Sequence, residues 1–499
     1  MNKKKGLIIA IAAAAVLTAA VLVLIFVPKG DSEKSHELDM GVDMERSVDG
    51  NGLHQVEIKT DKNGNIENNS YGTLMEYYPA NIREIHVENT KGTFDVESST
   101  KGTEATVYAI KGLEDFDLQS GNPDAIANAA AKLTFTKVAT LDKNKGAEFG
   151  FDKPRSTVTV SYEDDTRAVI IVGNDAPQQA GTYIKFGTGD AVFVTDTDTI
   201  APFDYGVTDL ISLTVNGAAE STENNEASSI KLAGSGFDKE IELVPNTNAN
   251  YSASYEMTAP VSRLANEGES SIVAGGIRGL LASAVKMVNP SDKQLAELGL
   301  AEPYATLTAE YPDTTVELSA SKPDADGNVN LMAAGKKVVY VISTEKVAWA
   351  ATSYEKLCGE YACSPKMAKL TGMSVKAGGK TYDFTLKTKE TLTTDDQGSE
   401  TKSTVTTVTY GGKEVELGSF TAFYNNVALI ELSDPKTDSK SGKEALAVTY
   451  TFEDGSSDEV VFADAGTDSY IVTFNGENAG HSAKGDVTRA VKSIAEVVK

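Results

Sequence analysis

The sequence is poor in the side chains that most often carry catalysis or bind metal ions. Its 499 residues include two cysteines and four scattered histidines, His36, His54, His86 and His481. Two cysteines cannot form a disulfide framework or a four-cysteine zinc site. The histidines leave little material for imidazole catalysis.

Positive charge is also scarce. The chain has 46 Lys and Arg against 72 Asp and Glu, which gives a formal charge of −26. Such a balance leaves no basic surface to neutralise phosphates, so a nucleic-acid partner is excluded. The acidic surface keeps an exported domain soluble and repels anionic lipid headgroups.

Aromatic residues make up 7% of the chain, but 40% of its residues are hydrophobic. This share is enough for folded cores, and the length predicts about three domains. The motifs of a phosphate loop, a dinucleotide fold, a zinc protease and a nucleophile elbow are all missing. We therefore predict a protein that is not an enzyme and has no catalytic, cofactor-binding or metal-binding residues.

The amino terminus has the pattern of a membrane anchor. Lys3, Lys4 and Lys5 precede an uncharged run from Gly6 to Val27. At 1.5 Å per residue this run would span roughly 33 Å as a helix, which matches a bilayer core. The lysines should remain in the cytoplasm and direct the rest of the chain outward. A cleaved signal peptide is the alternative, but its short apolar region and small-residue cleavage site are a poorer match.

Residues 30–80 are polar and are predicted to form a stalk. The phrase from Asp61 to Glu67 resembles part of a calcium loop but lacks its full spacing, so a hairpin turn is favoured. The same choice arises at Asp324-Ala-Asp326-Gly327-Asn328, where a hairpin loop is again favoured over calcium.

Beyond residue 80 one pattern of elements recurs three times. Each unit opens with two strands around a turn that contains glycine, beginning at Ile85, Ile230 and Met373. A helix is then expected, over residues 125–136, 277–288 and 420–427. Further strands follow, and each unit ends in a helical segment at residues 207–213, 353–357 or 486–499.

These patterns predict an α+β fold, in which each module combines an antiparallel sheet with two helices. The predicted organisation is a cytoplasmic lysine cluster and transmembrane signal anchor (1–29), a stalk (30–80), and modules at 81–215, 226–362 and 370–499. In the last helix, Val487, Val491, Ile494 and Val498 form an apolar stripe. Core packing is the favoured role of this stripe, with a partner-binding face as the alternative.

The two cysteines, Cys358 and Cys363, are five residues apart at the end of the second module. Outside the cytoplasm they could close a small disulfide ring if Gly359 ends the helix. Two free or buried thiols are the alternative, and a redox or metal role is the least favoured. Trp349 lies nearby and is expected to pack in a core rather than stack on a ligand.

Several phrases together resemble the domain of unknown function 4340, a family of bacterial cell-envelope proteins. The resemblance covers roughly residues 80–360. It rests on Ile82 to Gly92, on the phrases Gly150 to Pro154 and Gly299 to Pro303, and on Ile171-Val-Gly173 followed by Gly181-Thr-Tyr183. The third module departs from this pattern. Members of the family are associated with ABC-type export systems, including a gliding-motility component, so the resemblance implies an accessory role in the envelope.

The leading functional hypothesis is a single-pass membrane protein that acts as an accessory or scaffold in an envelope complex, with an ABC permease or ATPase as its protein partner. The alternative is an extracellular module that binds a wall polymer, a glycan or a peptide. A hydrolase that uses paired carboxylates is the least favoured hypothesis, since it needs two carboxylates across a cleft.

Overall fold

The structure is a computed structural model. It describes residues 52–53, 61–63, 65–66, 71–99, 106–163, 165, 167–187, 189–394, 400–432, 435, 442–466 and 468–499. The chain divides into two compact units, Met1–Leu210 and Ile211–Lys499. The predicted anchor and most of the predicted stalk lie outside the described residues.

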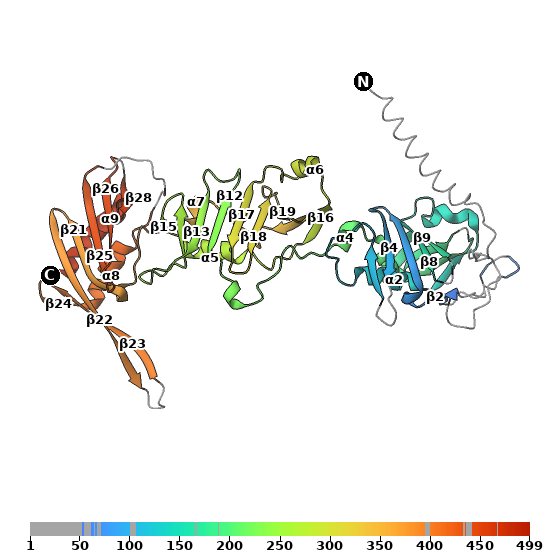
Figure 1. Ribbon diagram of the computed structural model, residues 1–499, viewed down its shortest axis with the longest axis horizontal. Helices are drawn as coiled ribbons and strands as arrows, with labels where there is room; N and C mark the ends of the chain where they lie inside the picture. Colours follow the sequence, from blue (N-terminus) through green and yellow to red (C-terminus); the bar gives the residue numbers. More distant parts are fainter. Residues whose placement is uncertain are drawn as a thin grey trace, which may run out of the picture. The chain divides into compact units, whose positions relative to one another are not determined.

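The first unit is built on an eight-stranded antiparallel sheet, called sheet 1 (Figure 1). Its strands, in spatial order, are β5 (Val107–Ile110), β4 (Gly92–Ser99), β3 (Ile82–Asn89), β8 (Ser156–Tyr162), β9 (Arg167–Asp175), β10 (Thr182–Phe186), β11 (Val192–Thr195) and β7 (Lys137–Thr140). Along β8, buried residues alternate with partly exposed ones. This alternation places one face of the sheet in the core.

The core face of sheet 1 is covered by short elements. The helix α2 (Asn122–Ala131) packs against β3 and β5 and buries Ile126 and Ala130. This unit also contains a three-stranded sheet. Its strands are β1 (Gly52–Leu53), β2 (Gly72–Glu76) and β6 (Lys132–Phe135), and β6 directly follows α2 in the sequence. The remaining elements of this unit are η1 (Pro79–Asn81), η2 (Lys143–Phe149), η3 (Pro177–Gln179), α3 (Thr197–Ile200), η4 (Ala201–Asp204) and α4 (Val207–Leu210).

The second unit contains two further sheets. Sheet 2 has nine strands, in the order β15 (Arg263–Leu264), β14 (Tyr255–Ala259), β13 (Ile241–Pro245), β12 (Ser229–Ala233), β17 (Ala305–Glu310), β18 (Thr315–Ala320), β19 (Asn328–Ala333), β20 (Val338–Ser343) and β16 (Ala284–Val288). Its helical elements are η5 (Thr222–Asn224), α5 (Glu267–Gly275), α6 (Asp292–Glu297), η6 (Ala348–Ala350) and α7 (Tyr354–Leu357).

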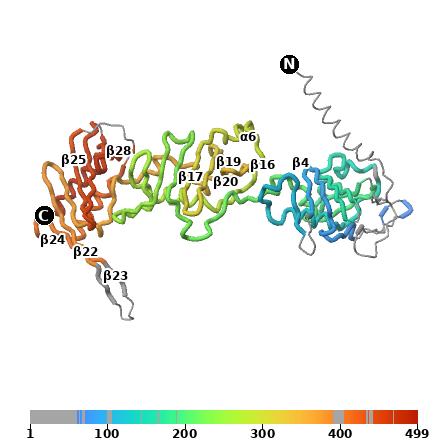
Figure 2. The backbone as a smooth tube through the Cα atoms, in the orientation of Figure 1, coloured from blue at the N-terminus to red at the C-terminus, as the bar shows by residue number. Residues whose placement is uncertain are grey.

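Sheet 3 has eight strands, and on either side of its central pair strands that are consecutive in the chain are neighbours in the sheet. Figure 2 shows its backbone in orange and red. The order is β24 (Lys413–Val415), β23 (Glu400–Tyr410), β22 (Lys380–Thr394), β21 (Leu370–Ala377), β25 (Glu444–Phe452), β26 (Ser457–Asp464), β27 (Ser469–Phe474) and β28 (Glu477–Ala483). The helices α8 (Leu417–Ala428) and α9 (Lys484–Val497) pack against each other, and η7 (Met367–Lys369) precedes the sheet.

The three large sheets share a central strand order. In each, the opening strand of the first hairpin pairs with the strand that follows the middle segment: β3 with β8, β12 with β17, and β21 with β25. The opening strand therefore ends up in the interior of the sheet, where its alternate side chains are buried. The predicted hairpins that begin at Ile85, Ile230 and Met373 are confirmed.

The prediction of an α+β fold, with a transmembrane helix ahead of modules that carry two helices each, is wrong for the described chain. Antiparallel sheets dominate it, and α3, α4 and α7 have four residues each. Within the described ranges, no helix is long and apolar enough to cross a membrane. The short helices lie in the connections between strands, and pairing between strands satisfies the backbone hydrogen-bonding groups of the sheets.

One predicted helix is a strand. Residues 277–288 have apolar side chains at helical spacing, but the helix α5 ends at Gly275 and residues 284–288 form β16. Gly276 and Gly279 weaken a helix in this segment, and pairing of β16 with β20 provides the alternative. By contrast, the helices predicted near 125–136 and 420–427 are found as α2 and α8, although α2 ends earlier.

Gly173 in β9 occupies a position where no side chain fits. A Cβ atom there would overlap the carbonyl oxygen of Phe149 and lie 2.9 Å from the Phe151 ring. We expect Gly173→Ala to destabilise the first unit by about 2 kcal/mol through overpacking. Hydrogen–deuterium exchange of the β8 and β9 amides measures this loss.

Gly146→Ala is the matched control for Gly173→Ala, because it makes the same substitution in the same unit. The nearest atom to its added Cβ would be Phe151 Cβ at 3.9 Å, an ordinary contact. We expect protection in β8 and β9 to stay within about 0.5 kcal/mol of the wild type. Equal hydrogen–deuterium exchange in Gly173→Ala and Gly146→Ala would show that the first unit accommodates a Cβ atom at residue 173 without losing stability.

Candidate functional site

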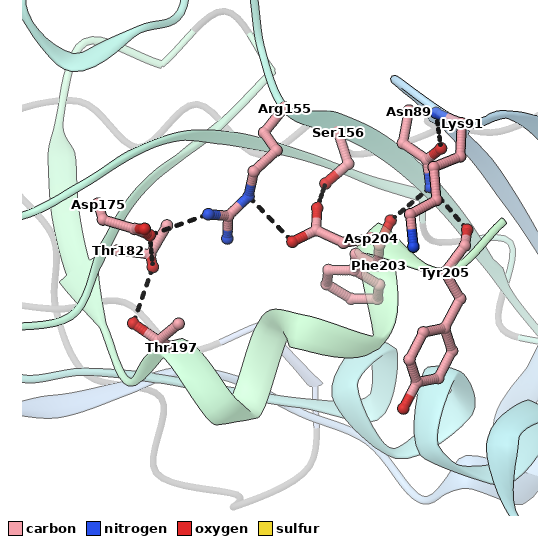
Figure 3. Close-up of polar contacts among 10 residues, drawn as sticks. All are labelled: Asn89, Lys91, Arg155, Ser156, Asp175, Thr182, Thr197, Phe203, Asp204 and Tyr205. Carbon is pink, nitrogen blue, oxygen red and sulfur yellow. Dashed lines mark hydrogen bonds and ion pairs between the residues drawn. The ribbon is translucent and has the colours of Figure 1, made fainter. Parts of the chain in front are cut away.

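Charged and hydroxyl side chains cluster at one end of sheet 1 (Figure 3). Arg155 directly precedes β8, Asp175 ends β9 and Thr182 begins β10. Because these strands are antiparallel, the three residues fall at the same end of the sheet. Asp204, the last residue of η4, completes the cluster.

Arg155 joins two carboxylates in this cluster. Its Nη1 lies 2.9 Å from Asp175 Oδ1, and its Nε lies 3.0 Å from Asp204 Oδ2. The Thr182 hydroxyl donates to Asp175 Oδ1 at 2.8 Å and lies 2.9 Å from the Thr197 hydroxyl. The cluster therefore links the sheet to α3 and η4 through side chains alone.

The two carboxylates respond differently to their surroundings. The hydrogen bond from Thr182, together with Arg155, lowers the pKa of Asp175. Burial raises the pKa of Asp204, although Arg155 opposes this effect. Each carboxylate is bound by the Arg155 guanidinium and by one hydroxyl, that of Thr182 on Asp175 and that of Ser156 on Asp204. The arrangement is that of a structural clamp.

Two bonds from Asn89, drawn in Figure 3, attach the β3–β4 hairpin to the same region, and an ion pair of Lys91 adds to them. Asn89 Nδ2 donates to the carbonyl oxygens of Phe203 and Tyr205 at 2.9 and 2.8 Å. Lys91 Nζ lies 2.7 Å from Asp209 Oδ2. Burial alone would raise the pKa of Asp209, but bonds from Lys91 and the Gly206 amide outweigh it and lower the pKa.

The second unit contains an open cleft of about 410 Å³ beside the end of β17. This volume is within the roughly 300–1,000 Å³ of small-molecule sites. Its walls come from the segment before β12, the start of β14, the helix α5 and the residue after β17. The lining residues are Asn225, Glu226, Ala227, Ser254, Tyr255, Ser271, Ala274, Gly275, Arg278 and Tyr311.

Arg278 forms one wall of this cleft and is held rigidly. Its Nη1 and Nη2 lie 2.9 and 3.1 Å from the two carboxylate oxygens of Asp313, and Nη1 also donates to the Asn224 carbonyl at 2.9 Å. The guanidinium carbon lies 4.8 Å from the centre of the Tyr311 ring. With its side chain 10% exposed, Arg278 presents a fixed planar surface.

The two tyrosines of the cleft remain neutral at physiological pH. Burial raises the pKa of Tyr311 to about 12, and Arg278 opposes this effect. Burial also raises the pKa of Tyr255, with smaller effects from the Glu226 and Glu267 carboxylates. Both phenols can therefore donate hydrogen bonds and offer ring surface, but neither is suited to act as a base.

The predicted cysteine pair lies in two different environments. Both thiols are free and buried. Cys358 lies beside Arg263 and Tyr354, and burial raises its pKa. Cys363 belongs to the core of sheet 3, where burial raises its pKa to about 12. The disulfide between them stays a prediction.

Tyr251 packs against Cys363 from a distant part of the sequence. It lies in the loop after β13 of sheet 2, yet its side chain is 4% exposed in the core of sheet 3. Its hydroxyl donates to the Asp458 carboxylate and lies 3.3 Å from Cys363 Sγ. Burial raises the Tyr251 pKa strongly, with further effects from Cys363 and Asp458.

The other residues singled out from the sequence have structural surroundings. Trp349 is fully buried, and its Nε1 donates to the Gly276 carbonyl at 2.9 Å. Asp324 accepts bonds from the Asp326 and Asn328 amides, and Asp61 accepts from the Asn63 and Asn65 amides, as in loop turns. In the apolar stripe of α9, Val487 and Ile494 are buried. Within the described residues, no His, Cys, Asp and Glu side chains gather in a group of three that could hold a metal ion.

Sequence reasoning missed Arg155 and Arg278, the central residues of the clamp and the cleft. The chain has seven arginines. Because arginine is scarce here and suits bidentate pairing with carboxylates, its positions were a usable signal.

The chain was compared with known proteins. The model of the family described as "Domain of unknown function (DUF4340)" matches residues 109–273. This segment begins in β5 of sheet 1 and ends in α5, beside the cleft. No curated protein and no solved structure matches the chain.

Arg155→Met should destabilise the first unit by roughly 1–3 kcal/mol, between the values for exposed and buried ion pairs. The native Asp204 pKa is already raised, so its contribution to stability is greatest at acid pH and is lost as pH rises through that pKa. Without Arg155 this pKa rises further. The stability deficit should therefore be larger at neutral than at mildly acidic pH, as measured by urea denaturation.

Two variants control the Arg155→Met experiment. Arg155→Met combined with Asp204→Asn should recover part of the stability, because it removes the unpaired charge. Arg83→Met removes an exposed pair with Asp165 and should change stability by less than about 0.5 kcal/mol. A deficit that does not depend on pH would argue against the electrostatic role of Arg155.

The buried cysteines should not react with a thiol reagent in the folded chain. We expect almost no modification under native conditions and two modified thiols per chain after unfolding without reductant. Mass spectrometry after alkylation counts them. Two thiols that appear only after reduction would instead establish the disulfide.

Proposed function

Residues 109–273 belong to the DUF4340 family of domains of unknown function, and from this premise we propose that the chain is a non-enzymatic accessory protein of an envelope complex. It is anchored in the cell membrane with its amino terminus in the cytoplasm, and it presents its sheets outside to a protein partner. The resemblance implies that this partner is the permease or ATPase of an ABC-type export system.

The clamp around Arg155 is the single observation that best supports a scaffold role. Its charged and hydroxyl groups bind one another and fasten α3 and η4 to sheet 1. These contacts hold the short elements rigidly on the sheet, as a protein that positions partners requires. The membrane part of the proposal rests on the sequence of residues 1–29, in which Lys3, Lys4 and Lys5 precede the apolar run.

A second candidate is an extracellular module that binds a wall polymer, a glycan or a peptide. The cleft at Tyr255, Tyr311 and Arg278 favours it, because ring surfaces and a fixed guanidinium are common in polar binding sites. The two candidates differ in whether the membrane anchor is needed for the interaction.

Affinity purification of the full chain, compared with residues 31–499, tests the proposal. A permease or ATPase recovered from detergent-solubilised membranes with the full chain, and not with the shorter one, supports the accessory role. Retention of the shorter chain on isolated wall material, with no transporter subunit recovered, would replace it with the second candidate. The Gly146→Ala chain should behave as the wild type in both assays and serves as the control for handling.

A further inference from the structure

The three large sheets can be aligned at the end of their central strand pair. Glu84 pairs with Ser161 in sheet 1, Ser229 with Glu310 in sheet 2, and Gly372 with Thr451 in sheet 3. In sheets 1 and 3 a further pair lies two residues before the opening-strand residue and one residue after the closing-strand residue. These pairs are Ile82 with Tyr162 and Leu370 with Phe452. In sheet 2 the same offsets lead to Ala227 and Tyr311, which lie beyond the last pair of β12 and β17 and both line the cleft.

In sheets 1 and 3 a tyrosine from outside the sheet covers the ring of this pair. Tyr77 stacks on Tyr162 with ring centres 3.7 Å apart. Tyr251 meets Phe452 edge to face at 6.0 Å. Both covering tyrosines are less than 10% exposed, so each ring is fully packed.

In sheet 2 the corresponding position is open. Ala227 stands where the other sheets have Ile82 and Leu370, and its small side chain lines the cleft of about 410 Å³ together with Tyr311. Arg278 covers one part of the Tyr311 ring. In this cleft no tyrosine of the described chain plays the role of Tyr77 or Tyr251; Tyr255 forms a wall instead.

We propose that this cleft binds the side chain of a tyrosine from a partner polypeptide, in the position that Tyr77 and Tyr251 occupy over the other two sheets. The ring would pack between Tyr311 and Tyr255, which offers aromatic contact on two sides. Polar groups of Glu226, Ser254 and Ser271 line the same cleft and are suited to bind the phenol hydroxyl or the backbone beside it.

An exposed aliphatic residue adjoins one of the lining residues of the cleft in the sequence. Ile272 follows Ser271 in α5 and is 56% exposed, although it is aliphatic. A residue next to the inserted tyrosine could cover it and remove apolar area from water. This inference rests on the proposed function in one respect, that the ligand is a protein.

The single tryptophan of the chain provides the test. Trp349 Nε1 is bonded to the carbonyl of Gly276, which adjoins Gly275 in the wall of the cleft. N-acetyl-L-tyrosinamide is titrated into the full chain, and tryptophan emission is excited where tyrosine does not absorb. Backbone amide NMR shifts of Ser271 and Gly275 give a second readout. We expect saturable binding, at least about tenfold tighter than that of N-acetyl-L-leucinamide or N-acetylglucosamine.

Ala227→Ile is the decisive variant, because it gives sheet 2 the side chain that Ile82 supplies in sheet 1. It should weaken binding of the probe by at least about tenfold. Ala334→Ile makes the same change at an exposed position and should leave binding unchanged. Should Ala227→Ile fail to fold, Tyr311→Leu should lose binding while Tyr311→Phe, which keeps the ring, retains it.

Equal binding of the three probes, or binding that Ala227→Ile and Tyr311→Leu leave intact, would overturn the inference. So would the absence of any saturable response in both readouts. These outcomes are separable from the proposed function. Recovery of a transporter subunit without tyrosine binding leaves that function standing, and tyrosine binding without such recovery refutes the function alone.

Discussion

Burial of the central strand pair is the constraint on which the three large sheets depend. Placing the opening strand of each first hairpin inside the sheet buries its alternate side chains, such as Ile85, Ile230 and Met373. The inward face must then be covered by something else in the chain. In sheet 1 the cover includes α2, and in sheet 3 it includes α8 and α9. The three sheets differ more in the elements that cover their inward faces than in their central strand order.

The cover of each sheet also explains where polar groups collect. The short elements α3 and η4 bury Ile200 and Phe203 against the first unit. Polar contacts add to this packing: Thr182 reaches Thr197 of α3, and Arg155 reaches Asp204 of η4. In sheet 2, Arg278 has a related task, since it joins Asn224 and Asp313 and packs on Tyr311. The same residue therefore stabilises the fold and shapes the cleft. A binding role for the cleft therefore requires no catalytic residues.

The sequence predicted strands well and helices less well, for a physical reason. Alternating patterns such as Ile85-His-Val87 identify a face directly, and these strands pair as expected. The segment 277–288 has helical spacing as well as an alternating end. The pairing of β16 with β20, which joins residues 50 to 57 positions apart, decides its structure. A local sequence pattern cannot predict pairing between strands so far apart in the chain.

The cleft was out of reach of sequence reasoning for a similar reason. Tyr311 is visible in the sequence as a strand residue, but its place in a cleft with Ala227 and beneath the Arg278 guanidinium depends on contacts between segments far apart in the sequence. The correspondence of Ala227 with Ile82 and Leu370 appears once the register of three strand pairs is known. The arginines, in contrast, could have been selected from composition alone.

Tyr251 links the order of synthesis to the order of folding. Sheet 3 completes its core with a side chain that belongs to a loop of sheet 2, more than 100 residues earlier in the chain. Domains usually fold as they emerge, beginning from the amino terminus. When residues 370–499 leave the ribosome, the loop that carries Tyr251 has long been made, so the late sheet can close on a template that is already in place.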